Sequence, residues 1–180
     1  MARIRISTDN DIPALCEVHR QAFGEVQGPE IVELVCALLE DTTAQPLLSL
    51  VAESGSGVAG HVLFTPVVIN DAEVEVSAHI LAPLAVLPGQ QSRGIGGALI
   101  RDGLRRLSAQ DVDLVFVLGY PDYYTRFGFK AAGRHGLTTP HPIPAAHQEG
   151  WMVQELKPGL LGRVRGQITC AGPLNHPQHW

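Results

Sequence analysis

A strand followed by a glycine-rich turn is the part of the sequence that most directly indicates chemistry. Residues 84–99 read LAVLPGQQSRGIGGAL, an apolar stretch, a Pro-Gly break, three glycines within four residues and the start of a helix. Glycines let a backbone approach a ligand closely, and the first turn of a helix presents unpaired N–H groups to an anion. The helix dipole favours a bound phosphate by about 0.3–1 kcal/mol. The turn therefore predicts a phosphate site, with close packing of helix on sheet as the structural alternative.

A second glycine pattern, at residues 55–60, satisfies G-x-G-x-x-G literally as GSGVAG. A dinucleotide site requires a helix after that turn, because the helix N-terminus faces the pyrophosphate. Here a β-branched strand follows, so this segment predicts a hairpin turn. The turn at 94–97 is not a Walker loop either, since no Lys followed by Ser or Thr comes after its glycines.

The rest of the sequence predicts the elements that must hold the phosphate turn in place. Alternating apolar residues predict strands, and apolar residues three and four apart predict helices. Capping residues at Asp9–Asp11 and the pair Gly28-Pro29 mark the starts of two helices. In order, we expect a strand at 3–7, helices over 12–23 and 29–39, strands at 47–53, 58–69 and 73–87, a helix at 93–109, a strand at 114–118, a short helix at 121–126, a loop at 133–150, and closing strands at 151–156 and 167–170. This order predicts a single α+β domain over residues 1–180, with a mixed sheet.

Pro83 lies inside the expected strand at 73–87. A proline has no N–H to donate to a strand ladder, so we expect this strand to be bulged or detached from its neighbour near Pro83. The irregularity would free backbone groups in the residues just before the glycine-rich turn.

Two motifs in order resemble the GNAT superfamily of N-acetyltransferases. Gln91-x-x-Gly94-x-Gly96 after a Leu-Ala-Val strand resembles the acetyl-CoA pyrophosphate signature, and YYTRFGF at 123–129 is similar to the Tyr-x-x-x-Gly-Phe segment of that superfamily. The resemblance covers about residues 3–132. LAPLAV at 81–86 together with the second motif is similar to a bacterial branch of acetyltransferases.

The resemblance implies the GNAT fold, a mixed and mostly antiparallel sheet whose central parallel strands splay apart between flanking helices. It also implies that the pantetheine arm of acetyl-CoA pairs with one splayed strand like an added strand. By the same resemblance, that arm contacts Leu84, Ala85 and Val86, and the pyrophosphate is held by Gln91, Ser92, Arg93, Gly94, Ile95, Gly96 and Gly97.

The activity that the resemblance implies is acetyl transfer from acetyl-CoA to a primary amine in a ternary complex, without a metal. Tyr124 occupies the family position of the acid that protonates the leaving thiolate, although a buried structural role would suit an aromatic residue there equally. We expect Tyr123 to point elsewhere. The general base is unassigned, with His79, Glu73 and Glu75 as candidates. Many relatives carry an Asn shortly before the tyrosine helix, and none occurs between Asp113 and Tyr124.

Composition limits the partners of this chain. Thirteen Lys and Arg against eighteen Asp and Glu give a net charge of −5, which argues against a nucleic-acid partner. The longest apolar runs are about eight residues against the roughly 20 of a membrane helix, so no membrane partner is expected. An N-terminus without a secretory signal makes the cytoplasm the expected location. A homodimer is left open.

Cysteine and histidine spacing indicates no metal site and no disulfide framework. The three cysteines, Cys16, Cys36 and Cys170, include no C-x-x-C pair. Cys16 and His19 lie one helical turn apart and could form a thiolate pair, but both fall on an apolar stripe, so we expect them to be packed in the core.

Three functions remain open from the sequence. The first is an acetyl-CoA-dependent N-acetyltransferase acting on an unknown amine, either a small molecule or a protein amine. The second is a catalytically inactive acyl-CoA-binding sensor or interaction module. The third is a nucleotide-binding protein that uses the same glycine turn.

Overall fold

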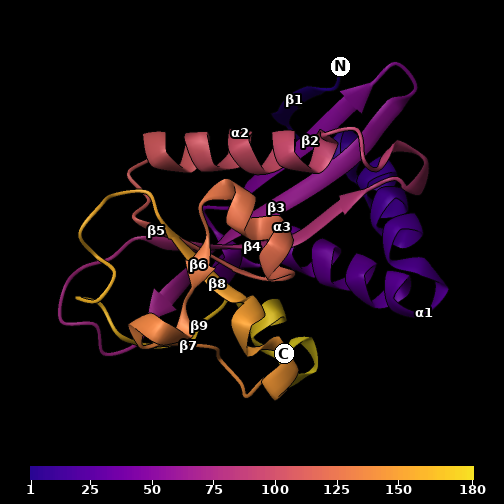
Figure 1. Ribbon diagram of the computed structural model, residues 1–180. Helices are drawn as coiled ribbons and strands as arrows, with labels where there is room; N and C mark the ends of the chain where they lie inside the picture. The colour runs from indigo at the N-terminus through magenta and orange to yellow at the C-terminus, as the bar shows by residue number, and fades with distance from the viewer.

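A nine-stranded sheet forms the centre of the computed structural model, which describes residues 1–180 (Figure 1). The sheet order is β1-β2-β3-β4-β5-β8-β6, with β9 pairing with the end of β3 and with β7. The strands are β1 Arg3–Ile6, β2 Leu48–Ser54, β3 Gly57–Ile69, β4 Ala78–Val86, β5 Leu114–Leu118, β6 Lys130–Ala131, β7 Leu137–Thr138, β8 Trp151–Glu155 and β9 Gly166–Thr169. All pairs along the main order are antiparallel except β4 with β5, so the predicted mixed, mostly antiparallel sheet is confirmed.

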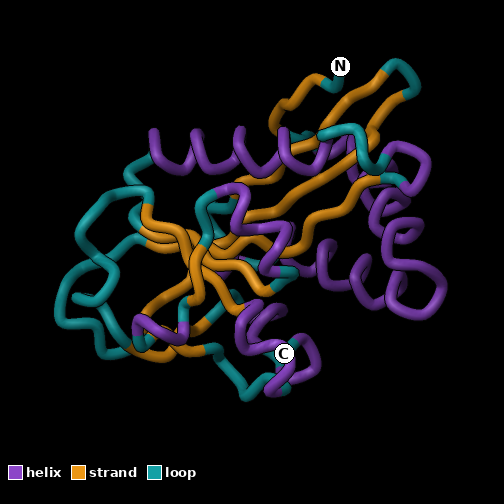
Figure 2. Tube along the Cα trace, in the orientation of Figure 1, coloured by secondary structure: helices purple, strands orange, loops and turns teal.

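Helices cover both faces of this sheet, as the purple helices and orange strands of Figure 2 show. They are α1 Ile12–Glu40, α2 Ile95–Ala109 and the single turn α3 Pro121–Tyr124. On β5, Leu114 and Phe116 pack in the core that contains Leu38 of α1, whereas Val115 and Val117 pack in the core that contains Leu99 of α2. The period-two alternation of β5 therefore divides the apolar residues between two helix-covered layers.

The helix α1 is broken at Gly24, whose φ of 82° and ψ of −178° are not helical. The sequence predicted two helices with the second starting at Gly28-Pro29, and that boundary was wrong by about four residues. Only glycine adopts a φ of 82° at little cost, so the chain turns at Gly24 rather than at the proline. The two halves then lie close together, because a Cβ built on Gly28 would come within 2.7 Å of the Arg20 carbonyl oxygen.

The expected strand at 73–87 was too long at its start. Residues 70–77 form turns and loop, and β4 begins at Ala78. The ladder between β3 and β4 ends at the pair Val67 and Ala78, and the residues before Ala78 leave the sheet. The segment expected as a loop at 133–150 also contains short 3-10 turns and β7.

The irregularity expected at Pro83 is present. Val62 of β3 pairs with Leu84, but Phe64 pairs with Leu81, so two residues of β4, including Pro83, bulge against one of β3. On the other side, β4 pairs with β5 only as far as Ile80 opposite Phe116. Beyond that pair the two parallel strands separate.

Buried hydrogen bonds connect α1 to the sheet. His19 Nε2 lies 2.7 Å from His61 Nδ1, and His61 Nε2 lies 2.8 Å from Ser49 Oγ, which accepts a hydrogen bond from Ser7. His19 thus pairs with His61 and not with Cys16, whose sulfur lies 3.5 Å from that of Cys36. The expected packing of Cys16 and His19 is confirmed for His19, which is fully buried.

These buried histidines predict that acid destabilises the fold. Burial lowers the pKa of His19 to about 4. Burial also lowers the pKa of His61, well below the ordinary value of a histidine. Because the unfolded chain takes up protons near pH 6.5 and the folded chain does not, the free energy of unfolding should fall as the pH drops from 6.5 to 4. The loss from His19 alone is about 3 kcal/mol. Urea titrations at a series of pH values measure it.

His61→Gln removes one titrating group and should flatten that pH dependence, although it lowers stability at pH 7. The exposed His147→Gln is the matched control and should leave the slope as in the parent protein. An unchanged slope in His61→Gln would show that acid sensitivity arises elsewhere.

Candidate active site

The glycine-rich turn presents a continuous row of backbone donors. Gly94 caps α2 with a φ of 81°, and Ser92 also has a positive φ, of 61°. No backbone carbonyl accepts a hydrogen bond from any of the six amides from Ser92 to Gly97. Six consecutive unpaired N–H groups at the positive end of a 15-residue helix form an anion-binding surface.

The loop that carries these donors is tied to the end of β4. Gln91 Nε2 donates to the Val86 carbonyl oxygen at 3.1 Å, so the Gln91 side chain closes the turn on the strand that precedes it. The amides are therefore held at the end of β4, next to the edge that separates from β5.

The separated edge of β4 supplies further backbone groups. Residues 84–86 pair with β3 on one side, and their other side faces away from that ladder, beyond the last β5 pairing at Ile80. Along an antiparallel strand, alternate N–H and C=O groups point to opposite edges. The open edge can therefore pair with an extended, amide-containing ligand in the manner of an added strand.

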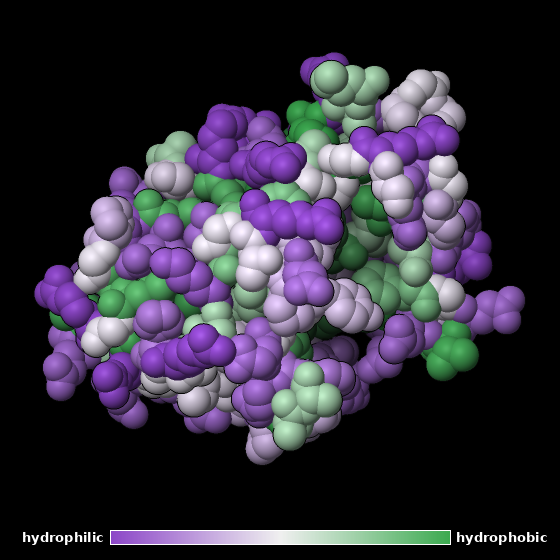
Figure 3. Space-filling model, in the orientation of Figure 1, coloured by the Kyte–Doolittle hydropathy of each residue, from purple (hydrophilic) through white to green (hydrophobic).

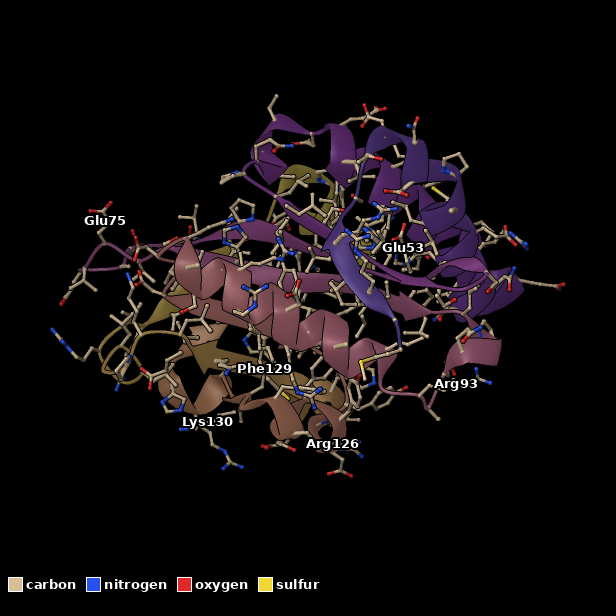
Figure 4. All side chains as sticks on the ribbon, turned by 90° about the horizontal axis from the view of Figure 1, so that it is seen from above. Glu53, Glu75, Arg93, Arg126, Phe129 and Lys130 are labelled. Carbon is tan, nitrogen blue, oxygen red and sulfur yellow. The ribbon has the colours of Figure 1, made fainter.

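A groove of about 820 Å³ joins the turn, the open edge of β4 and α3. It brings together nearly all of the predicted site residues, namely Leu84, Ala85, Val86, Gln91, Ser92, Gly94, Ile95, Gly96, Gly97 and Tyr124. Arg93 does not line the groove. It is exposed, donates to Gln90, and lies at the outer end of the turn in Figure 4.

Both tyrosines of α3 line the groove, so the expectation that Tyr123 points elsewhere was wrong. The helix has only four residues and continues as a 3-10 turn, and the two rings meet edge to face at 5.0 Å. A Cβ built on Gly96 would lie 2.6 Å from the Tyr123 hydroxyl oxygen, which places that hydroxyl over the glycine turn. Tyr124 is more deeply buried, and its burial, followed by the effect of Tyr123, raises its pKa above the ordinary value.

The positive charge of the groove comes from two residues that were not predicted as site residues, although Arg126 belongs to the YYTRFGF motif. Arg101 and Arg126 line the groove and lie over the rings of Phe127 and Tyr123, at 5.1 and 5.8 Å from the centroids. Arg101 is four residues after Gly97, so the helical repeat places both on the same face of α2. That spacing was the signal that could have identified Arg101.

Gly119 is a further position that the sequence did not single out. A Cβ built on it would lie 2.3 Å from Cε2 of Tyr124, so the tyrosine ring packs directly on the Gly119 backbone. The absence of a side chain at Gly119 is what lets Tyr124 occupy its place in the groove.

The candidate bases lie outside this groove. His79 is buried and its Nε2 lies 3.0 Å from the Pro46 carbonyl oxygen, and burial lowers its pKa. Glu73 and Glu75 are exposed in the loop before β4, and Glu75 lies at the opposite end of the molecule from Arg93 (Figure 4). No group of three or more His, Cys, Asp or Glu side chains is placed to hold a metal ion. None of the helices combines the length and apolar character that crossing a bilayer requires.

Comparison with known proteins agrees with this geometry. A family model described as the acetyltransferase (GNAT) domain matches residues 3–132. The Escherichia coli K12 protein named uncharacterized N-acetyltransferase YjhQ is 41% identical over 169 residues, which cover 93% of this chain and 91% of that protein. The chain belongs to the GNAT acetyltransferase family, so the resemblance drawn from the motifs is confirmed.

Two solved structures share the fold. Escherichia coli YhbS in complex with CoA superimposes with a TM-score of 0.85 at 29% identity, covering 98% of this chain and 93% of that one. A GNAT acetyltransferase from Brucella melitensis in complex with acetyl-CoA superimposes with a TM-score of 0.76 at 30% identity, covering 97% and 98%. The predicted GNAT fold is therefore confirmed.

The packing of Tyr124 on Gly119 predicts that one methyl group added at Gly119 lowers the stability of the fold. Gly119→Ala should lower the free energy of unfolding by about 1–3 kcal/mol, because the new Cβ overlaps the tyrosine ring. Urea unfolding measures the change. Gly133→Ala is the matched control, since a Cβ there meets nothing within 4 Å, and its stability should stay close to that of the parent. Equal stability of the two variants would contradict this account of Gly119.

Proposed function

We propose that this acetyltransferase moves the acetyl group of acetyl-CoA to a primary amine, by direct attack within a ternary complex. The observation that carries the proposal is that one groove brings together the row of unpaired amides from Ser92 to Gly97, the open edge of β4 and Tyr124.

The groove matches acetyl-CoA in chemistry along its length. The amides, together with Arg101 and Arg126, oppose the negative charge of a pyrophosphate. Leu84, Ala85 and Val86 offer backbone groups to the amides of the pantetheine arm. The solved relatives with CoA and acetyl-CoA support this assignment. The Arg93 side chain, which lies outside the groove, acts through long-range charge, whereas its backbone amide is one of the six donors.

In the proposed reaction, the lone pair of a neutral amine attacks the thioester carbonyl carbon and forms the new C–N bond. Collapse of the resulting oxyanion breaks the C–S bond, and the leaving thiolate takes the hydroxyl proton of Tyr124. The proton lost from the amine nitrogen passes through solvent and restores the Tyr124 hydroxyl. Holding both reactants together supplies about 7–11 kcal/mol of the barrier, so positioning is the larger contribution of the protein.

The environment of Tyr124 suits the role of acid. Its raised pKa keeps the hydroxyl protonated throughout the neutral range, so the proton is in place when the thiolate forms. The Gly119 backbone and Phe129, whose ring lies 5.7 Å away edge to face, fix the orientation of the phenol. A non-catalytic acyl-CoA-binding module would need the same amides but no hydroxyl at this position.

Tyr124→Phe tests the acid and separates the enzyme from the module. The single-turnover rate of thiol release should fall by about 10²–10⁴-fold, because the thiolate then leaves without a proton donor. The dissociation constant of acetyl-CoA should stay the same. Tyr123→Phe is the matched control and should retain the rate of the chemical step. A full single-turnover rate in Tyr124→Phe would refute the assignment.

Gly96→Asp tests the pyrophosphate site. The new carboxylate would face the unpaired amides, displace Tyr123 and repel a pyrophosphate, so CoA should bind about 100-fold more weakly. Isothermal titration with CoA measures the change. Gly89→Asp is the matched control, because Gly89 precedes the same turn, has open space at its Cβ and does not line the groove. Unchanged affinity in Gly96→Asp would place the pyrophosphate elsewhere.

A further inference from the structure

A second cavity, of about 410 Å³, adjoins the groove on the side of the separated strands. Leu84, Tyr120 and Tyr124 line both spaces, so the cavity meets the groove where the proposed reaction takes place. We call it the acceptor cavity. Its walls come from both halves of α1, from β4, from the end of β5 and from the C-terminal residues 174–180. Figure 3 shows the surface hollowed beside α3, with apolar residues in the hollow.

The lining of the acceptor cavity is almost entirely apolar. Thirteen of its sixteen residues are hydrophobic, and no Asp, Glu, Lys or Arg is among them. Phe23 and Ile31 stand on the two sides of the Gly24 break, and Trp180 closes the end near Leu174, to whose carbonyl oxygen its indole N–H donates at 2.9 Å. The volume lies within the about 300–1,000 Å³ of small-molecule sites.

We propose that the acceptor cavity binds the acetyl acceptor, and that this acceptor is a monoamine carried on an uncharged apolar or aromatic body. The inference rests on the proposed acetyl transfer, because it places the amine of that reaction beside Tyr124. A polycationic acceptor would have to bury several charges against an apolar wall that offers no carboxylate to pair with them.

The apolar wall also helps to make the amine reactive. Only the neutral amine has a lone pair for attack, and desolvation disfavours the ammonium form. An amine seated among Phe23, Leu84 and Pro83 therefore loses its proton to solvent more readily than in water. Desolvation of the amine therefore provides its neutral form in a cavity whose lining contains none of the candidate bases, His79, Glu73 and Glu75.

An acidic cavity lies next to the acceptor cavity. Its carboxylates could pair with the charges of a polyamine, so a polyamine is the alternative acceptor to consider. Glu30, Glu33 and Asp41 line the acidic cavity, and it shares Leu34 and His179 with the acceptor cavity. Those two shared residues separate the carboxylates from the wall that contains Tyr124. The acidic residues therefore stand outside the space that holds the reacting amine, and we assign the acceptor by the apolar wall.

The test compares 2-phenylethylamine with spermidine, a longer aliphatic amine that carries several charges. Binding of each amine to the CoA-loaded protein is measured by isothermal titration, and thiol release from acetyl-CoA is measured with each amine. We expect 2-phenylethylamine to bind, and its kcat/KM to exceed that of spermidine by about tenfold or more.

Two variants place a charge in the cavity and one places it outside. Phe23→Asp and Ile31→Asp should each raise the KM for 2-phenylethylamine by about tenfold and leave the KM for acetyl-CoA within about twofold. Val26→Asp is the matched control on the same helix, because Val26 is 91% exposed, and it should behave as the parent. Stabilisation of each variant by CoA checks its folding.

The outcomes separate the two proposals. Preferential turnover of spermidine, with Phe23→Asp and Ile31→Asp unchanged, would overturn the inference and leave acetyl transfer intact. A rise in the KM for acetyl-CoA instead of the amine would also overturn it, because the cavity would then belong to the acyl donor. Binding of 2-phenylethylamine that Phe23→Asp abolishes, without thiol release from any amine, would support the cavity and refute the proposed reaction.

Discussion

The separation of β4 from β5 beyond Ile80 is the constraint on which the rest of the site depends. A bulge on the β3 side includes Pro83, and the partner on the other side ends its pairing at Phe116. Backbone groups of residues 84–86 are thereby left without a neighbouring strand. Unpaired backbone groups are costly when buried, so they persist only where a ligand or solvent satisfies them. The same opening separates the groove from the acceptor cavity and leaves Tyr124 between them.

The acceptor side is held in place by polar contacts as well as by packing. The hydrogen bonds from His19 through His61 to Ser49 join α1 to β3 and β2. A polar row of this kind contributes stability only while both histidines stay neutral, because burial disfavours the charged form of each imidazole, and for His61 it outweighs the opposing effect of Asp11. The Phe23 ring stacks on the His19 ring with 6.1 Å between the two centroids, and Phe23 also lines the acceptor cavity. The part of α1 that His19 holds on the sheet therefore reaches the wall of that cavity. The wall that selects the amine is thus fixed by a network inside the sheet.

Charge in this protein is arranged locally. The chain carries a net charge of −5, which by itself would repel a pyrophosphate. In the proposed pyrophosphate site, six amides and two arginines oppose this repulsion, and both arginines lie over aromatic rings. The acceptor cavity next to it has no Asp, Glu, Lys or Arg side chain on its walls. Donor and acceptor sites therefore differ in electrostatics although they share Tyr124, and each suits the chemistry of a different reactant.

The sequence by itself determined the local features of this protein. The glycines at 94–97, the helix that follows them and the proline at 83 are each specified by backbone chemistry within a few residues, so the glycine-rich turn and the strand irregularity could be predicted from spacing. The break in α1 was placed at Gly28-Pro29 instead of Gly24, because sequence alone does not show which of two glycines adopts a positive φ. The start of β4 was misplaced because strand pairing depends on a distant partner, and the ladder with β3 begins only at Ala78 opposite Val67.

Only the tertiary structure decided which side chains share a space. Arg93 belongs to the motif and lies outside the groove, whereas Arg101 and Tyr123 line it through helix geometry that a motif does not encode. The role of Gly119 follows from the ring of Tyr124 packing against its backbone. The acceptor cavity unites Phe23 with Trp180, at opposite ends of the chain. Contacts between residues so far apart are set by how the layers pack, and packing is decided by the whole chain.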